Sequence, residues 1–278
     1  MNAPPSRAPE PLATRMVEKV WGRDQLPAPF AAPEGKRIGE IWFDPHPDCA
    51  QLLVKYLFTS EKLSVQVHPS DEQALEGEDG KAECWLVLDA EPEARLAIGF
   101  ERAMSTGEIA AAARDGAIEQ CLAWHQARAG DVFFLPPGTV HAIGPGLSLV
   151  EVQQASDTTF RLYDYGRDRA LHLDRALAVA DPGPYPSAHR GSVASRGQVL
   201  VDTPHFRIDR IEGAPDAQTL EDYDTALLAL PLEGMLGGKG SGPGGTPRFS
   251  AGGCVWAPRL ATLDFSAAQV TLLVRPCP

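Results

Sequence analysis

The chain has 278 residues, of which 44% are hydrophobic and 22% are charged, proportions typical of a soluble globular protein. Its formal net charge of -12 repels phosphate backbones, so a nucleic-acid partner is not expected. Its apolar runs fall short of the ~20 residues that a membrane-spanning helix requires, so a membrane partner is not expected either. The 26 glycines and 25 prolines indicate many turns and therefore a large β content.

The first residues of the chain are rich in proline and polar side chains and contain no apolar segment typical of a secretion signal. We expect residues 1–15 to form a flexible tail. The chain has five cysteines, an odd number, and no two of them have C-x-x-C spacing. This usage indicates free thiols in a reducing compartment, so the predicted location is cytoplasmic.

From Ile41 onward the pattern is typical of β-strands. The run 51–58 (QLLVKYLF) is mostly apolar and rich in strand-forming residues. The run 62–68 (KLSVQVH) alternates apolar and polar residues, which places Ser64, Gln66 and His68 on one strand face. Further strand patterns occur at 84–88, 94–100, 131–135 and 147–153.

One segment within this β pattern is rich in alanine and has helical spacing. Ser105 or Thr106, together with Glu108, is typical of a helix N-terminus, and Gly116 is typical of a helix end. We therefore expect a short helical segment over about 104–128, made of two helices.

Residues 181–198 combine proline, glycine and serine and are the best candidate for a linker. Beyond them, short apolar runs alternate with turn signals. The sequence therefore predicts a catalytic domain over 16–185 and a smaller C-terminal β module over 186–278.

Four polar residues form the candidate metal site: Gln66, His68, Glu83 and His141. Gln66 and His68 share a strand face, Glu83 begins the next strand, and His141 follows the turn that begins at Pro136. Two imidazoles, a carboxylate and an amide oxygen suit a borderline divalent cation. Zinc fits this ligand set best, while manganese, iron, cobalt and nickel stay open.

Several sequence motifs resemble those of a known family. Residues 130–141 (GDVFFLPPGTVH) fit the second cupin motif, G-x5-P-x-G-x2-H. LSVQVHP, GKAECW and QQASDTTFRLYDYGR resemble signatures of the type I mannose-6-phosphate isomerases, especially their short bacterial branch. The resemblance covers about residues 20–180 of the chain. It implies a mainly β fold: a cupin jelly-roll barrel with a short helical insertion, followed by a smaller, degenerate cupin-like β module.

The resemblance also implies a function. The chain would be a zinc-dependent aldose–ketose isomerase that interconverts mannose 6-phosphate and fructose 6-phosphate through an enediolate, with one Zn²⁺ per chain. The metal ligands it implies are Gln66, His68, Glu83 and His141. Arg161 would be the active-site arginine, and the remaining pocket residues would be Lys55, Ser64, Lys81 and Glu151.

The roles of the other charged residues follow from chemistry. Arg161 keeps its charge and presents a planar fork of donors, which suits either an enediolate oxygen or the substrate phosphate. Arg167 is a second candidate for substrate binding, with Lys55. The reaction also needs a base, for which Lys81, Glu151 and a metal-bound water are the candidates.

Two other functions are weighed against the isomerase. A metal cupin enzyme of another chemistry, such as an oxygenase, would use histidine where Gln66 stands. A non-catalytic sugar-phosphate-binding cupin would be expected to have a damaged site, whereas all four ligand positions and Arg161 are present. A monomer and a homodimer both remain open.

Overall fold

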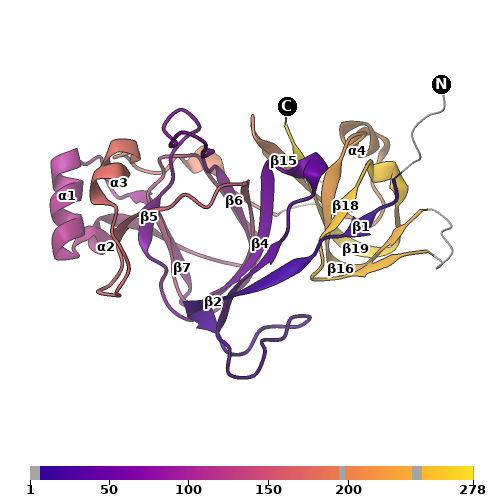
Figure 1. Cartoon of the computed structure of the whole chain (residues 1–278), viewed down its shortest axis with the longest axis horizontal. Helices are drawn as coiled ribbons and strands as arrows, with labels where there is room; N and C mark the ends of the chain where they lie inside the picture. Colours follow the sequence, from indigo (N-terminus) through magenta and orange to yellow (C-terminus); the bar gives the residue numbers. More distant parts are fainter. Residues whose placement is uncertain (1–6, 194–197, 240–245, 278) are drawn as a thin grey trace.

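The computed structural model describes residues 7–193, 198–239 and 246–277. Three β-sheets are stacked in a row, with helices α1, α2 and α3 at one end of the row (Figure 1). We call them the helix-side sheet, the central sheet and the C-terminal sheet. No helix within the described part of the chain is long and apolar enough to cross a membrane.

The helix-side sheet has five antiparallel strands, which are, in spatial order, β12 (Phe160–Tyr163), β5 (Val65–Val67), β10 (His141–Ile143), β7 (Arg95–Phe100) and β8 (Leu122–Gln126). The central sheet has seven strands, in the order β13 (Arg190–Ser192), β9 (Asp131–Leu135), β6 (Glu83–Ala90), β11 (Leu147–Gln154), β4 (Leu52–Phe58), β3 (Ile38–Phe43) and β2 (Thr14–Arg23).

The C-terminal sheet also has seven strands. Their path is β1 (Glu10–Pro11), β18 (Val255–Ala257), β16 (Leu227–Gly238), β19 (Leu263–Pro276), β15 (Phe206–Glu212) and β14 (Gln198–Asp202), with β17 (Arg248–Ser250) paired to β16. The α-helices of the described residues are α1 (Thr106–Asp115), α2 (Ile118–Cys121), α3 (Leu173–Val179) and α4 (Ala217–Asp222).

The helix-side and central sheets face each other and enclose an apolar cluster. Trp85 and Phe133 from the central sheet pack there with Leu96, Ile98 and Ile143 from the helix-side sheet. On the other side of the helix-side sheet, β5 packs its valines against α1. The predicted alternation is confirmed, because the polar residues of that strand then point into the barrel. The mainly β barrel with a helical insertion agrees with the cupin expectation.

The inner strands of the central sheet are buried on both faces, and β4 shows how. All seven of its residues are buried. Tyr56 and Phe58 belong to an apolar cluster shared with the C-terminal sheet. Leu57 belongs to the cluster inside the barrel, and Lys55 lines a cavity there. This explains why the strand is almost continuously apolar rather than alternating.

The helical segment was predicted correctly at its start but not at its end. Ser105 caps α1 in a capping box with Glu108, and Gly116 ends the helix with φ of 82°. The prediction of helix as far as 128 was wrong, because residues 122–126 form β8 and pair with β7. Pairing with an open sheet edge outweighs the local helical preference of this alanine-rich segment. α3, at Leu173–Val179, was not predicted.

Two segments belong to other parts of the fold than the predicted domain boundaries imply. Glu10–Pro11, expected in a flexible tail, pairs with β18, and the N–H of Leu12 donates to the carbonyl of Cys254 at 2.9 Å. Residues 1–6 lie outside the described part of the chain. Within the expected linker, Arg190–Ser192 pairs with β9 of the central sheet. The barrel therefore extends past 185, and the C-terminal sheet includes a strand from the start of the chain.

Deletion of residues 1–12 should therefore lower the thermal stability of the protein. It removes the β1 pairing and the contacts that Leu12 makes with the core shared by the two modules. We expect the Tm to fall by roughly 3–8 °C, since each kcal/mol lost shifts Tm by about 2–4 °C at this size. Differential scanning calorimetry measures the shift, and an unchanged Tm would show that the docked segment contributes no stability.

Candidate metal centre and active site

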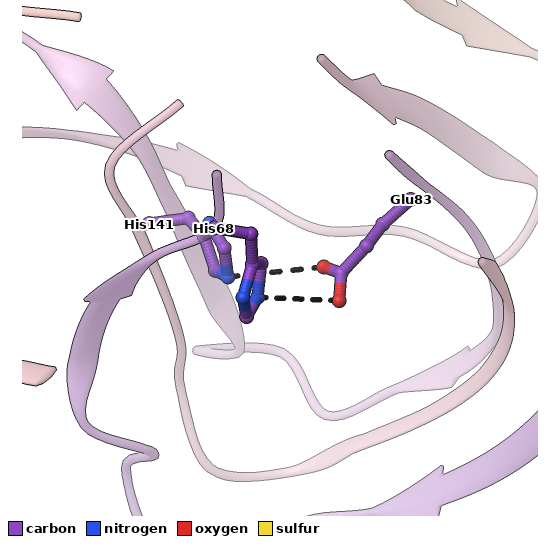
Figure 2. A group of neighbouring side chains, drawn as sticks. All are labelled: His68, Glu83 and His141. Carbon is purple, nitrogen blue, oxygen red and sulfur yellow. Dashed lines mark ion pairs between the residues drawn. The ribbon is translucent and has the colours of Figure 1, made fainter. Parts of the chain in front are cut away.

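Three ligand-type side chains meet at one end of the barrel. His68 directly follows β5, and His141 opens β10, where it is paired with Gln66. Glu83 reaches them from β6 in the opposite sheet. Figure 2 shows the two imidazoles side by side, facing the carboxylate. Nε2 of His68 lies 3.3 Å from Oε1 of Glu83, and Nε2 of His141 lies 3.8 Å from its Oε2.

The imidazole rings are held in the orientation that a metal needs. Nδ1 of His68 donates to the carbonyl of Thr158 at 2.7 Å, and Nδ1 of His141 donates to that of Thr139 at 2.9 Å. Each Nε2 therefore keeps its lone pair and faces Glu83. Backbone carbonyls commonly fix metal-binding histidines in this way.

Two of the ligand atoms are buried and lack hydrogen-bond partners. Nε2 of His68 and Oε2 of Glu83 have no hydrogen-bond partner among the described residues, and the ligand atoms of the three residues lie within 4.8 Å of one another. An unsatisfied buried polar atom costs about 1–3 kcal/mol. Two such atoms converging on one point are what a cation would satisfy, so these residues fit a metal ion.

The protonation states also suit metal binding, which requires neutral imidazoles and an ionised carboxylate. Burial lowers the pKa of His68 to about 4, with a further contribution from the charge of Lys81, and burial also lowers the pKa of His141. Burial alone would raise the pKa of Glu83. The nearby charge of Lys81 outweighs it and holds this pKa well below its usual range.

Gln66 lies beside this group. Its Oε1 accepts a hydrogen bond from Oγ of Ser64 at 3.0 Å, and its Nε2 lies 3.3 Å from Nε2 of His141. A half-turn of the amide exchanges its oxygen and nitrogen. That rotation would direct the oxygen at the point where the histidines and Glu83 converge, so Gln66 is placed to supply a fourth ligand.

A second polar network lies next to the triad on the central sheet. Nζ of Lys55 donates to Oε1 of Glu151 at 3.1 Å and to Oε1 of Gln153 at 2.6 Å. Nε1 of Trp85 donates to Oε2 of Glu151 at 3.0 Å. Burial, reinforced by the negative charge of Glu83, raises the pKa of Glu151. This carboxyl is thus shifted toward the neutral range in which proton transfer is effective.

Lys81 differs from Glu151 in its electrostatics. Its Nζ lies 3.0 Å from Oε1 of Glu83. Burial opposes the charged ammonium, but the coulombic attraction of Glu83 and Glu151 outweighs it and raises the pKa of Lys81. Lys81 is therefore a fixed cation beside the triad rather than a free amine.

Arg161 is a cation of this cavity that forms no ion pair within the described residues. It lies on β12, opposite Gln66, and its Nε is buried without a hydrogen-bond partner in the described ranges. Burial and the nearby charge of Arg169 lower its pKa, yet a guanidinium remains protonated at physiological pH. Arg169, in contrast, is held by two bonds of 2.6 Å to Asp164. An uncompensated guanidinium is suited to an anionic ligand group.

The structure brings most of the predicted site residues to one cavity inside the barrel. Those that line it are Lys55, Ser64, Gln66, Lys81, Glu83, Glu151 and Arg161. Arg167 is not part of the described lining. Its guanidinium binds Glu61 at 3.0 Å and the carbonyl of Lys62 at 2.8 Å. The cavity geometry therefore gives no support to the prediction that Arg167 binds substrate.

Sequence reasoning missed other residues that line the cavity, including Arg169, Asp157 and the ion pair between Lys19 and Glu40, at 3.0 Å. Lys19 and Glu40 lie on β2 and β3, and no motif marks them. Arg169 stands two positions after Arg167, but the sequence offers no signal for choosing between them.

Comparison with known proteins identifies the family. No family model matches the chain. The mannose-6-phosphate isomerase of Streptococcus mutans serotype c (strain ATCC 700610 / UA159) is 39% identical over 271 residues, which cover 81% of this chain and 84% of the relative. The chain belongs to the mannose-6-phosphate isomerase family. A probable mannose-6-phosphate isomerase of Bacillus subtilis (strain 168), GmuF, is 33% identical and covers 81% of this chain and 70% of the relative.

Solved structures of isomerases with this name share the fold. The crystal structure of the mannose 6-phosphate isomerase from Bacillus subtilis has a TM-score of 0.79 and 25% identity, covering 97% of this chain and all (100%) of that one. A zinc-bound mannose 6-phosphate isomerase has a TM-score of 0.70 at 13% identity, covering 98% of this chain and 100% of that one. At that identity the second likeness shows the fold alone.

Replacement of His141 by alanine should abolish stable metal binding. The change removes one of the converging Nε2 atoms, and we expect the metal affinity to fall by more than the roughly 10–100-fold typical of residues that only orient a ligand. Metal content after dialysis is measured by mass spectrometry. His125→Ala is the matched control, because His125 also has a buried, unpartnered Nε2 within the described chain but lies on β8, away from the triad. Stoichiometric metal in His141→Ala would contradict the assignment.

Proposed function

We propose that this chain is a zinc-dependent aldose–ketose isomerase that interconverts D-mannose 6-phosphate and D-fructose 6-phosphate. The observation that carries the proposal is a buried His–Glu–His triad with unsatisfied ligand atoms, whose Glu83 lines the same cavity as the guanidinium of Arg161. The proposal is further supported by relatives named mannose-6-phosphate isomerase that align with most of the chain.

One Zn²⁺ per chain is the proposed cofactor. His68, Glu83 and His141 would hold it, with Gln66 as the fourth ligand. Two nitrogens and two oxygens suit this borderline cation. When bound, the ion supplies Lewis-acid polarisation of the oxygens of a sugar. A zinc-bound isomerase with the same fold supports the choice of metal.

Arg161 is the proposed electrostatic catalyst. Aldose–ketose isomerisation moves a proton between C1 and C2, and negative charge develops on O1 and O2 of the enediolate. A fixed donor at those oxygens stabilises the transition state more than the ground state. The Nε of Arg161 has no hydrogen-bond partner in the described chain to lose on binding, so its guanidinium is free to pair with the oxygen that becomes charged.

Glu151 is the proposed proton carrier between C1 and C2. Its raised pKa, caused mainly by burial, makes it a better acid and base near neutrality than an exposed carboxyl. Lys81 was the other protein candidate, but its raised pKa keeps it an ammonium. We assign Lys81 the role of balancing the charge of Glu83 and donating a hydrogen bond in the cavity.

The remaining substrate contacts are assigned to the cavity lining. Lys55 and Ser64 are proposed to bind the sugar, because both are buried there and carry donors. For the phosphate we favour Arg169, which lines the cavity, over Arg167, which is tied to Glu61.

We further propose a cytoplasmic enzyme that works as a monomer or a homodimer. The free state of the five cysteines supports a reducing compartment. We propose two modules: a catalytic barrel built from the central and helix-side sheets, and a smaller cupin-like module built on the C-terminal sheet. The substrate would be a small sugar phosphate, and the net charge of -12 argues against a nucleic-acid partner.

A coupled assay tests the proposed reaction. Purified protein of known metal content is given mannose 6-phosphate, and the formation of fructose 6-phosphate is followed with and without a chelator. We expect turnover that the chelator removes and added Zn²⁺ restores. Absence of turnover in protein that carries one metal per chain would favour a non-catalytic sugar-phosphate-binding cupin or another metal-dependent chemistry.

Replacement of Arg161 by alanine should separate catalysis from metal binding. We expect kcat to fall by about 100–1000-fold, the usual loss when one donor to a developing oxyanion is removed, while the metal content stays at one per chain. Arg167→Ala serves as the control and should change kcat by less than about threefold, because its guanidinium is held outside the cavity. Near-normal kcat in Arg161→Ala would remove this residue from the mechanism.

A further inference from the structure

A second cavity lies on the opposite face of the central sheet, between it and the C-terminal sheet, which lie next to each other in Figure 1. Its volume is about 340 Å³, within the range of roughly 300–1,000 Å³ typical of small-molecule sites. We call it the interface cavity. It shares no lining residue with the cavity lined by Glu83 and Arg161, as far as the described residues go.

The walls of the interface cavity come from both modules and from one loop. Tyr56, Phe58 and Leu86 line it from the central sheet, and Val270 lines it from β19. The loop that joins β2 and β3 closes one side, where the ring of Phe30 lies 4.6 Å from that of Tyr56 and 5.1 Å from that of Phe58. The space is thus enclosed mainly by aromatic and aliphatic side chains.

The contact between this loop and the C-terminal module is close. A Cβ added at Gly252 would lie 2.6 Å from Cγ of Pro29 and 3.1 Å from the ring of Phe30. Gly252 also has a φ of +85°, a conformation that favours glycine. The loop is therefore seated on the second module, and the wall it forms is a built part of the fold.

Two hydroxyl groups in this apolar lining form no hydrogen bond with the described part of the protein. Oη of Tyr56 and Oγ of Ser148 are buried, and neither has a hydrogen-bond partner in the part of the chain that the structure describes. The two residues are only 1% and 2% exposed, and both line the cavity. Buried hydroxyls without partners are rare and cost about 1–3 kcal/mol each. Both lie on the sheet face that turns toward the C-terminal module.

The charges at the rim indicate what kind of molecule is accepted. Asp89 and Glu233 lie at the cavity and are exposed, while Arg210 is bound to Glu212 at 2.7 Å. The rim is thus negative in balance, which disfavours an anion such as a sugar phosphate. A ring packed on Phe30 and Phe58 and one uncharged polar group would satisfy both the walls and the free hydroxyls.

We propose that the interface cavity is a binding site for a neutral, ring-bearing small molecule with a hydroxyl group, of the aryl-alcohol or phenol class. The ring occupies the apolar part of the cavity, and the hydroxyl group exchanges hydrogen bonds with Tyr56 and Ser148. The site is separate from the isomerase site and does not depend on the function proposed for it.

Titration calorimetry of the metal-loaded full chain with 2-naphthol tests the site. We expect saturable binding of one molecule per chain. Tyr56→Phe and Ser148→Ala each remove one hydroxyl with little change in packing, and each should weaken binding by about 3–10-fold, the loss expected for one hydrogen bond. Thr271→Val is the matched control. Its Oγ1 is also buried and unpartnered within the described ranges, but Thr271 is not in the cavity lining, so its affinity should be unchanged.

A cavity-filling variant provides an independent readout. Leu232→Trp places a larger side chain in the space that Leu232 lines and should remove 2-naphthol binding while circular dichroism shows a folded protein. Absence of saturable binding to the unmodified protein would overturn the proposal. It would also be overturned if neither hydroxyl variant changed the affinity, or if a crystal structure showed 2-naphthol elsewhere.

Discussion

The fold depends on one constraint: a β-strand has two faces, and in the inner strands of the central sheet neither face is open to water. Along β4 the polar Lys55 faces the barrel interior, while its neighbour Tyr56 faces the C-terminal sheet. β6 and β11 follow the same rule with Glu83 and Cys84, and with Val150 and Glu151. Because side chains alternate strictly, the outer apolar residues fix the register that directs the inner polar residues at the site.

This arrangement places several charges in the interior, where an unpaired charge costs several kcal/mol. The structure offsets them in pairs. Lys81 lies against Glu83, and Lys55 lies against Glu151. Arg161 forms no ion pair within the described chain, so its guanidinium is left to bind an anion. A protein with a net charge of -12 can therefore still present a local anion site.

The sequence predicted the residues of the barrel interior well, because their positions depend on local rules. The alternation in 62–68 and the capping box at Ser105 each need only a few neighbouring residues, and both are found in the structure. The triad could be predicted because each of its members lies in a motif that resembles the family. What failed depends on partners distant in sequence. Glu10–Pro11 becomes a strand only through Trp256 and its neighbours, and 122–126 becomes one through β7.

Arg167 and Arg169 cannot be told apart from sequence for a related reason. The two residues are separated by one position in a charged loop, and their roles are set by Asp164 and Glu61, which hold them in place. Glu61 lies more than a hundred positions earlier in the chain, and no local rule connects it with Arg167. The interface cavity was equally beyond the reach of sequence, since it arises where two sheets and a loop leave a space between them.

The C-terminal module contributes no residue to the described lining of the active-site cavity, yet the site depends on it. It covers Tyr56, Phe58 and Val150 on the outer face of the central sheet. Without that cover, these side chains would face water, and burying each of them is worth about 1.5–3 kcal/mol. The strands that carry Lys55 and Glu151 would then lose the packing that holds their register. The second module therefore supports the site indirectly, because it shields the outer face of the central sheet from water.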